Sequence, residues 1–503
     1  MIDVAVQPKS HIVFIAYESW GAVLRIKPVY VTFFVVHRLY DRVRAELQRN
    51  FAPEEQSVLQ LVRVVGLHHE SFDPIDTRDI DAHFEDAYGK LVKKEPVTCM
   101  HTSVQYDAIP PPEVVFIDFY ALRPLQAVRG LSGKSAKVYV WFSGSPDAFI
   151  AAFGPASIGG KADLYPQVKE EVAKTGRDLN EVAMQIMHGI SGRVVRVPGL
   201  PPMYDYEHIP QEVPLWIVAL IRLSCLTGSD GVVFSTPEPL QPEAIASVRE
   251  WFTQENRVTY SFGPLVPSGT RAADYELVQS GKGGEIQQFL DSVLKSHGEH
   301  SLVYWSFGSV FWPTDPAKVW VILDVLMEKK IPFIMSHASP FGAVPEAVQE
   351  KVQQYGLGIL CPWTPQQTIL GHSATGWFVT HAGLNGVLES LSQGVPMICW
   401  PFTADQPTNA AHLSNDLNVA YELLEVRSGL GLRPIFRTGK APTGTVESVR
   451  AEAQELFGKA FEEDGAEKRA NALKMKEAFA RCWEEGGSSE KELRRLVGSF
   501  GPV

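Results

Sequence analysis

The stretch of residues 363–406 contains the groups best suited to binding chemistry. Its middle, residues 376–381, is a short apolar run rich in β-branched and aromatic side chains, which is typical of a buried strand. Gly383 follows this run, and leucine and valine residues then recur at helical spacing from near Asn385. A tight turn from strand to helix directs unpaired N–H groups and the positive end of the helix dipole at one place. The sequence therefore predicts an anion site at this turn.

Several side chains add further chemistry to the predicted turn. His381, at the end of the strand, supplies a hydrogen-bond donor. Glu389 lies one turn along the helix from Asn385, and a carboxylate there can accept two hydrogen bonds from a ribose diol but would repel a phosphate. Trp363 places an aromatic plate beside polar groups at one end of the stretch, and Asp405 follows a Trp-Pro pair at the other. A generic βα unit with solvated polar residues would not require these flanks.

This stretch resembles the nucleotide-sugar signature of the family 1 UDP-glycosyltransferases, which are best known from plants. It is 44 residues long, the length of that signature, and it matches without a gap. Trp, Pro-Gln, Ile-Leu-x-His-x-x-x-Gly, Thr-His-x-Gly-x-Asn, Glu, Gly-Val-Pro, Trp-Pro and Asp-Gln all fall in register. The resemblance implies a UDP-sugar donor whose uracil contacts Trp363 and the backbone of Thr364 and whose ribose contacts Gln366 and Glu389. It further implies that the sugar hydroxyls contact Asp405 and Gln406. The residues implied at the diphosphate are His381, Gly383, Leu384, Asn385 and Gly386.

Two positions depart from the plant pattern. Leu384 stands where Trp is usual, and Gly386 stands where Ser usually gives a hydrogen bond to a phosphate. Gly386 still offers its backbone N–H, so we expect weaker binding of the diphosphate rather than its loss. By the same resemblance, Gln406 favours glucose as the transferred sugar.

Transfer of a sugar to a hydroxyl needs a base for the acceptor's proton and an electrostatic sink for the leaving diphosphate. In the family the base is a His in the turn after the first strand, oriented by a later Asp. Asp118, which ends the buried run 114–117, matches that Asp, but Ala22 stands where the His is expected. Three explanations remain open: an engineered loss, a natural loss that leaves a binding protein, and a different base. Glu18 or Asp118 could be that base, although a carboxylate with a pKa of about 4 is a poor one for an alcohol.

Loss of a positioned base costs roughly 10²- to 10⁴-fold in rate, whereas ground-state binding of the nucleotide should survive. We therefore expect a UDP-sugar site with impaired transfer to unactivated hydroxyls, and acidic acceptors should be affected least. The alternative function is a catalytically inactive UDP-sugar-binding protein, and Ala22 is the feature in its favour. A nicotinamide dehydrogenase is a second rival, but no G-x-G-x-x-G follows the first strand.

Other candidate residues have weaker support. Ser309, in a Ser-Phe-Gly-Ser turn, resembles the family's diphosphate-facing loop, and Ser143 follows a strand and could reach the sugar. Residues 133–135 end like a phosphate loop, but Val128 stands where the first Gly of that motif belongs. Residues 68–70, His-His-Glu, lack the spacing of helical metal ligands and indicate a solvated loop. We expect neither a metal nor another cofactor, with UDP-glucose as the donor substrate.

Strands and helices alternate along the chain, which predicts parallel sheets covered on both faces. Residues 27–40 fit a helix and a strand equally well, and 193–210 indicate a long loop over the acceptor cleft. The other elements expected in the first half are strands at 11–17, 58–67, 114–117, 137–142 and 231–235 and helices at 77–94 and 216–225. Those expected in the second half are strands at 301–307, 332–336 and 358–361 and helices at 285–296, 406–417 and 447–485.

This order predicts an α/β protein of GT-B architecture, in which two doubly wound Rossmann-like domains face a cleft, and the resemblance implies the same. We divide the chain into an N-terminal acceptor-binding domain (1–262), a linker with the first helix (263–297) and a C-terminal UDP-sugar-binding domain (298–485). The remaining residues, 486–503, are expected to form a helix that packs back on the N-terminal domain.

Length and composition agree with this division and exclude other classes. The 503 residues suffice for two or three domains, and the net charge of -12 argues against a nucleic-acid partner. Five cysteines, odd in number and far apart, are typical of reduced thiols in a cytosol-like compartment. We find no secretory signal and no uncharged apolar run of roughly 18 residues. We therefore expect a cytoplasmic monomer without a membrane span, acting on a UDP-sugar and a small lipophilic acceptor whose identity the sequence does not specify.

Overall fold

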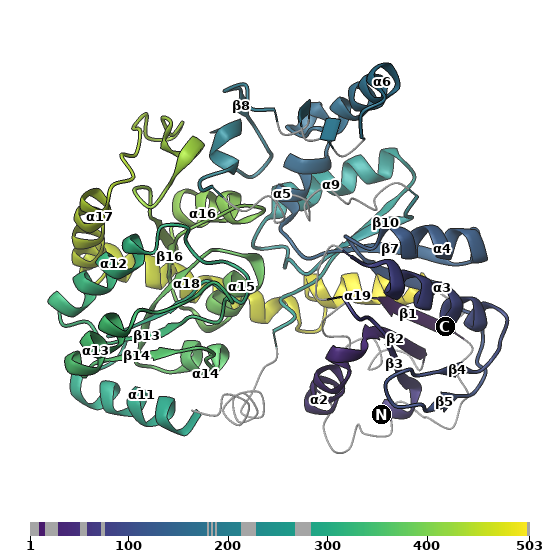
Figure 1. The fold of residues 1–503 in the computed structure, drawn as a ribbon, viewed down its shortest axis with the longest axis horizontal. Coiled ribbons are helices and arrows are strands. Elements are labelled where there is room, and N and C mark those ends of the chain that lie inside the picture. Colours follow the sequence, from purple (N-terminus) through teal and green to yellow (C-terminus); the bar gives the residue numbers. More distant parts are fainter. Residues whose placement is uncertain are drawn as a thin grey trace.

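The computed structural model describes residues 10–15, 29–50, 58–71, 76–178, 181–182, 185–186, 189–212, 228–266 and 283–499. Two parallel β-sheets organise these residues, one from each half of the chain, and helices cover both faces of each sheet (Figure 1). The predicted GT-B architecture is confirmed. In the described part of the chain, no helix is both long and apolar enough to cross a membrane.

The first strand of the N-terminal sheet lies near the centre of the sheet, and later strands are added first toward one edge and then toward the other. All its strand pairs are parallel. In spatial order the strands are β11 (Val258–Ser261), β10 (Gly231–Phe234), β7 (Lys137–Phe142), β6 (Val114–Asp118), β1 (His11–Ile15), β2 (Tyr30–Val36) and β3 (Val62–Leu67). The strand order therefore reverses between β1 and β6.

Alternate residues of these strands enter different cores, as the two-residue period of a strand requires. Val115 and Ile117 of β6 pack in the core formed with helices α3 (Arg78–Val92) and α4 (Leu122–Ser132). Phe116, between them, packs in the core on the opposite face. Burial on both faces explains why these strands are continuous apolar runs rather than alternating ones.

The C-terminal sheet repeats this plan. Its strands, also all parallel, are in spatial order β14 (Gly358–Cys361), β13 (Phe333–Ser336), β12 (Leu302–Ser306), β15 (Thr375–Thr380), β16 (Met397–Cys399) and β17 (Ala420–Glu422). The strand order reverses between β12 and β15. Tyr304 and Trp305, neighbours in β12, enter the two different cores of this domain.

The remaining elements cover the sheets or join them. The other helices of the N-terminal half are α2 (Tyr40–Asn50), α5 (Pro146–Phe153), α6 (Tyr165–Thr175) and α9 (Pro242–Gln254), with the 3-10 helices η1 (His37–Leu39), η3 (Ala156–Ile158), η4 (Ala162–Leu164) and η5 (Asp205–His208). The C-terminal half has α11 (Gly283–His297), α12 (Ala317–Glu328), α13 (Glu346–Tyr355), α14 (Gln366–Gly371), α15 (Leu384–Gln393), α16 (Gln406–Asn415), η6 (Gly429–Leu432), α17 (Val446–Lys459), α18 (Glu463–Cys482) and α19 (Ser488–Gly498). Two short antiparallel pairs complete the fold, β4 (Val97–Thr98) with β5 (Gln105–Tyr106) and β8 (Val194–Val195) with β9 (Met203–Tyr204).

Helix α19 belongs to the packing of the N-terminal sheet, although it ends the described chain. Its Leu493 and Leu496 are buried in the same core as Phe116. The guanidinium of Arg495 lies 4.3 Å from the centre of the Tyr260 ring in β11. Figure 1 shows α19, in yellow, running from the C-terminal half to this position.

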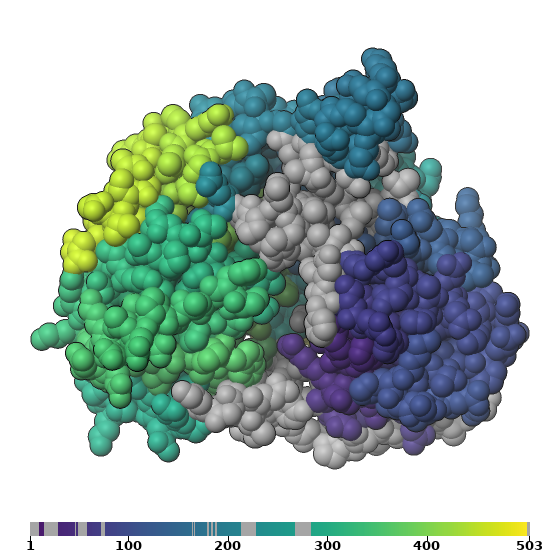
Figure 2. Space-filling model, in the orientation of Figure 1, coloured from purple at the N-terminus to yellow at the C-terminus, as the bar shows by residue number. Residues whose placement is uncertain are grey.

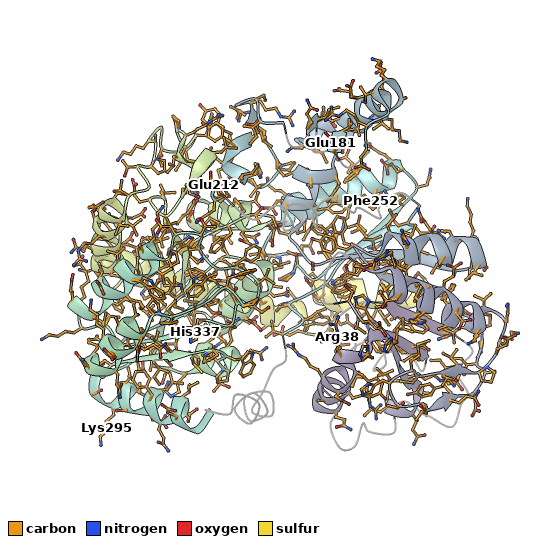
Figure 3. The ribbon with its side chains drawn as sticks, viewed as in Figure 1. Arg38, Glu181, Glu212, Phe252, Lys295 and His337 are labelled. Carbon is orange, nitrogen blue, oxygen red and sulfur yellow. The ribbon has the colours of Figure 1, made fainter. Side chains whose placement is uncertain are left out.

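Residues 193–210 are largely irregular, in agreement with the predicted loop, and their place over the acceptor cleft stays a prediction. They contain β8, β9 and η5, and they pack on the C-terminal domain (Figure 2). The Tyr206 hydroxyl donates to the Pro434 carbonyl at 2.6 Å, and Glu207 accepts the N–H of Phe436 at 2.9 Å. Nearby, the N–H of Glu212 donates to Ser428, which places Glu212 among C-terminal elements (Figure 3). The proline and glycine residues here therefore serve a domain contact.

Two further expectations have definite outcomes. Within the ambiguous run 27–40, Tyr30–Val36 form strand β2 and His37–Leu39 form η1, because the Val and Phe side chains of the strand are buried on both faces of the sheet. Residues 58–61 form a 3-10 turn before β3 rather than part of that strand. The helix expected at 216–225 lies outside the described residues.

Candidate functional site

The topology places the candidate site at two reversals of strand order. In open α/β sheets, ligands bind beyond the carboxyl ends of the strands where the order reverses. In the C-terminal sheet this point lies between β12 and β15, whose following loops contain Ser309 and His381. In the N-terminal sheet it lies between β1 and β6, and Asp118 is the last residue of β6.

The turn after β15 is as tight as the sequence predicts. Ala382 has a φ of 65°, a left-handed conformation that is uncommon outside glycine, and α15 begins two residues later at Leu384. Gly383 has no side chain that could cap the helix. A Cβ there would lie 2.5 Å from Nε2 of His381, so only glycine fits beside that ring. The first N–H groups of α15 are therefore directed toward the reversal point without partners inside the helix.

His381 is held as a neutral imidazole beside this helix end. Burial lowers its pKa to about 4, so at neutral pH one ring nitrogen carries a proton and the ring is uncharged. Its Nδ1 has no hydrogen-bond partner among the described residues. Gly308 also approaches the ring, and a Cβ there would lie 3.2 Å from Cε1. His381 is thus closely approached by two glycine-containing turns and can offer a hydrogen bond without adding a charge.

Asp405, near the other end of the 363–406 stretch, contacts the same turn. Its Oδ2 accepts the N–H of Leu384 at 3.1 Å and the side-chain amide of Asn409 at 2.9 Å. Burial raises the pKa of Asp405 to about 6, against the opposing effect of these hydrogen bonds. Gln406 is buried, and its Oε1 accepts the N–H groups of Phe402 at 2.9 Å and of Thr403 at 3.2 Å. Asp405 and Gln406 are therefore fixed beside the helix end by the backbone around them.

The predicted nucleoside contacts form one hydrogen-bonded group. The Gln366 amide donates to Glu389, and the Gln366 carbonyl accepts the hydroxyl of Tyr304 at 3.0 Å. The same hydroxyl lies 2.8 Å from Oγ1 of Thr364. Trp363, beside Thr364, is 40% exposed, so its ring is accessible to a stacking partner. Sequence reasoning missed Tyr304, because a tyrosine in a buried strand gives no signal that its hydroxyl supports a site.

Residues of the N-terminal domain face this site. A Cβ on Gly144 would lie 3.6 Å from Cβ of Asp405, which places the exposed Ser143 beside the predicted sugar contact. Oδ1 of Asp118 accepts the N–H of Tyr120 at 2.9 Å, and burial raises the pKa of Asp118 to about 6. Burial, followed by the charges of Asp118 and Asp405, raises the pKa of the Tyr120 phenol. Tyr120, also missed from the sequence, is therefore close to acidic groups of both domains.

The remaining predicted residues fall into three groups. Leu384 is buried in the apolar core and contributes its N–H rather than its side chain to the site. Asn385 and Ser309 are exposed, and Gly386 is buried. Ala22, the position of the expected base, lies outside the described residues. Within the described chain, which includes the His-His-Glu run 68–70, no three His, Cys, Asp or Glu side chains are placed to hold a metal ion.

The fold is that of a two-domain GT-B protein, with the N-terminus of α15 at the point where the strand order of the C-terminal sheet reverses. Residues 261–426 match the family model described as UDP-glucoronosyl and UDP-glucosyl transferase. UDP-glycosyltransferase eriJ from Hericium erinaceus is 31% identical over 97% of this chain and 98% of its own. The chain therefore belongs to the UDP-glycosyltransferase family.

Two further comparisons concern smaller regions or the fold alone. Anthocyanidin 3-O-glucosyltransferase from Solanum melongena is 29% identical over 53% of this chain and 61% of its own. The crystal structure of a UGT transferase from Siraitia grosvenorii in complex with UDP superposes with a TM-score of 0.68 at 20% identity, covering 98% of this chain and 99% of that one. The shared fold thus extends over both domains.

Proposed function

We propose that this protein transfers glucose from UDP-glucose to a hydroxyl group of a small lipophilic acceptor, with inversion at the anomeric carbon. The observation that carries the proposal is the meeting of three features at the reversal between β12 and β15. These are the N-terminus of α15 beside a neutral His381, the carboxylate of Glu389 one turn along, and the exposed ring of Trp363. They suit a diphosphate, a ribose diol and a uracil ring respectively.

The reaction that these groups support is a direct displacement. The acceptor oxygen forms a bond to the anomeric carbon as the bond from that carbon to the UDP oxygen breaks. The acceptor's proton passes to a base, and the electron pair of the broken bond leaves with UDP. N–H groups at the start of α15 and the His381 ring would stabilise the charge that develops on the diphosphate. No covalent sugar intermediate is required, so the anomeric configuration inverts.

The support for glucose and for a lipophilic acceptor comes from the residues that face the site. Asp405 and Gln406 are held beside the helix end, where sugar hydroxyls would lie. A relative in Solanum melongena is named as a glucosyltransferase of anthocyanidins. Beyond Asp118, the ring of Tyr120 is 39% exposed and packs edge-to-face on the buried Phe119, with the ring centres 5.1 Å apart. An exposed aromatic ring at this position favours a flat, apolar acceptor.

Because Ala22 replaces the expected base, we propose that transfer to unactivated alcohols is slow. The test is UDP release from UDP-glucose with phenolic and alcoholic acceptors, measured on this chain and on Ala22→His, with UDP binding measured by calorimetry. A gain of about 100-fold in Ala22→His is expected from the restored base. UDP binding without transfer by either form would instead favour the inactive UDP-sugar-binding protein, and absence of UDP binding would refute both readings. EDTA is expected to leave the rate unchanged.

A further inference from the structure

Helix α16 contacts the N-terminal domain at two points, and the first lies at the predicted sugar site. Asp405 directly precedes the helix, and a Cβ on Gly144 would lie 3.6 Å from Cβ of Asp405. Gly144 belongs to the turn between β7 and α5, which also contains Ser143, the other side chain predicted to reach the sugar. Figure 1 shows α16 and α5 side by side where the two halves of the chain meet. One turn from each domain therefore borders the place expected for the sugar.

The second contact lies about two turns further along α16, at His412. Nε2 of His412 lies 2.7 Å from the carbonyl oxygen of Leu240, which belongs to the segment between β10 and α9 of the N-terminal domain. The side chain of Leu240 is buried in the core of the C-terminal domain, to which Ala410 and Leu413 of α16 also belong. His412 itself is buried. Its imidazole therefore binds a part of the N-terminal domain that is anchored in the C-terminal core.

Gln241 connects the two contacts. It follows Leu240 in the chain, and its Oε1 accepts the N–H of Asp147 at 3.3 Å. Asp147 is the second residue of α5, so its N–H is one of the first N–H groups of that helix and has no acceptor inside it. Gln241 supplies this acceptor from outside the helix. It therefore fixes the start of α5, directly after the turn that contains Gly144.

Charges on the two sides of the domain boundary reinforce this connection. Asp147 of the N-terminal domain is buried, and burial raises its pKa against the opposing effects of the Ser145 hydroxyl and the charge of His412. Burial lowers the pKa of His412, but the Asp416 hydrogen bond and the charge of Asp147 raise it above its ordinary value. Each group thus favours the charged form of the other across the boundary. Because a buried charge without a partner is strongly unfavourable, the pair favours this one arrangement of the domains.

We propose that His412 is a positioning residue for the transferred sugar. Through Leu240 and Gln241 it holds the turn 143–145 against Asp405, so that both domains contact the same sugar at once. This inference rests on the proposed transfer of glucose from UDP-glucose. The groups proposed to bind the nucleotide all belong to the C-terminal domain, so loss of His412 should weaken binding of UDP-glucose and leave binding of UDP unchanged.

A purely structural role is the rival explanation for His412. In that case, its loss would lower the stability of the protein without distinguishing UDP-glucose from UDP. Tyr206 offers a matched comparison, because its hydroxyl also donates to a carbonyl across the two halves of the chain, that of Pro434, at 2.6 Å. That bond joins η5 to the segment after η6, and neither segment belongs to the two turns at the predicted sugar site.

The experiment measures the Kd of UDP and of UDP-glucose by calorimetry for the full-length wild type, His412→Asn, His412→Gln, Gln241→Leu and Tyr206→Phe, and thermal unfolding checks that each is folded. Asn is too short to reach the Leu240 carbonyl, and Leu cannot accept the Asp147 N–H. Both variants should therefore raise the Kd of UDP-glucose roughly 5- to 30-fold, the size of a typical coupling between sites, and change that of UDP less than about twofold. His412→Gln, whose amide can still donate to Leu240, should stay within about threefold of the wild type for both ligands.

Tyr206→Phe should lower the unfolding temperature without changing either Kd. Two results in His412→Asn would overturn the proposal, namely an equal rise in both Kd values and no change in either. A loss specific to UDP-glucose that is as large in Tyr206→Phe would also overturn it, because any weakened domain contact would then suffice. If His412→Asn does not fold, Gln241→Leu provides the same comparison and decides the question.

Failure of this inference and failure of the proposed function give different results, because binding is measured without turnover. If the wild type binds UDP-glucose but glucosylates no acceptor, the proposed function is wrong, and the two Kd values still decide the role of His412. If the wild type transfers glucose while His412→Asn and Gln241→Leu bind UDP-glucose as tightly as it does, the transfer stands and His412 is not a positioning residue. Where transfer is measured, kcat/KM in His412→Asn should fall by more than the Kd rises, because a displaced sugar also misplaces the reacting atoms.

Discussion

The N–H of Leu384 donates to the carboxylate of Asp405 at 3.1 Å, and this bond joins the start of α15 to the loop before α16. A carboxylate is favoured at a helix N-terminus by the dipole, but it also occupies one of the N–H groups that bind anions there. Asn409 strengthens the connection by donating to both Asp405 and the Ala382 carbonyl. The predicted anion site and the predicted sugar contact therefore share a single turn.

Asp405→Asn should weaken binding of the sugar part of UDP-glucose without weakening binding of the nucleotide. The Asn oxygen can still accept the Leu384 N–H, so the turn should keep its shape. Hydrogen bonds from sugar hydroxyls to a charged group are worth about 1.5–3 kcal/mol, so the KM for UDP-glucose should rise roughly 10- to 100-fold. Calorimetry should show nearly unchanged affinity for UDP itself. An equal loss of affinity for UDP and UDP-glucose would mean that Asp405 supports the turn rather than the sugar.

Gly386→Ser should strengthen binding of the diphosphate. A Cβ at this position would lie 3.5 Å from Phe378 and 3.6 Å from Oγ1 of Thr380, which are ordinary contact distances. The serine hydroxyl would add one hydrogen bond near the helix end, worth about 1 kcal/mol, or about fivefold in the Kd of UDP. Replacing a helical glycine should also raise the free energy of unfolding by up to about 0.5 kcal/mol. Weaker UDP binding in this variant would show that the Gly386 Cα faces away from the phosphates.

Tyr304→Phe should loosen the nucleoside contacts. The variant removes hydroxyl contacts to Thr364 and Gln366 and leaves the ring stacked on Phe378. We expect a loss of about 1–2 kcal/mol in stability and a rise of several-fold in the Kd of UDP. Tyr355→Phe is the control, since that hydroxyl donates to the Ile331 carbonyl away from the site. It should lower stability without changing the Kd, and equal effects of both variants on UDP binding would contradict the role given to Tyr304.

Local patterns could be predicted from the sequence, and contacts between distant residues could not. The strand, turn and helix around His381 follow from apolar periodicity and glycine placement, and so does the parallel character of both sheets. The role of Tyr304 depends on strand β12 lying beside β15, which periodicity does not reveal. The run 27–40 was ambiguous because short Val- and Phe-rich segments fit a buried helix as well as a buried strand. The packing of residues 193–210 on the C-terminal domain could not be predicted, because proline and glycine mark turns but do not show what those turns pack against.

The last prediction concerns His412, where α16 meets the N-terminal domain. Its Nδ1 lies 2.9 Å from Asp416, and its Nε2 lies 2.7 Å from the carbonyl of Leu240 in the N-terminal half. Burial lowers the pKa of His412, but the Asp416 hydrogen bond, the charge of Asp147 and the Leu240 carbonyl outweigh this effect and raise it above the ordinary value. Both ring nitrogens can therefore donate, so the folded protein favours the imidazolium form.

A histidine whose pKa is raised by folding stabilises the folded state fully below its unfolded pKa of about 6.5, and this contribution disappears as pH rises through the folded pKa. Urea unfolding should accordingly show that the wild type loses stability relative to His412→Gln as pH is raised from 6 to 9. The difference should be about 1.5–3 kcal/mol, the size of a hydrogen bond that involves a charged group. The exposed His297, replaced in the same way, should leave the pH dependence unchanged. Parallel pH profiles for wild type and His412→Gln would show that His412 stays neutral at the domain contact, and the buried carboxyl of Asp147, whose pKa is also raised, would then be the group to test.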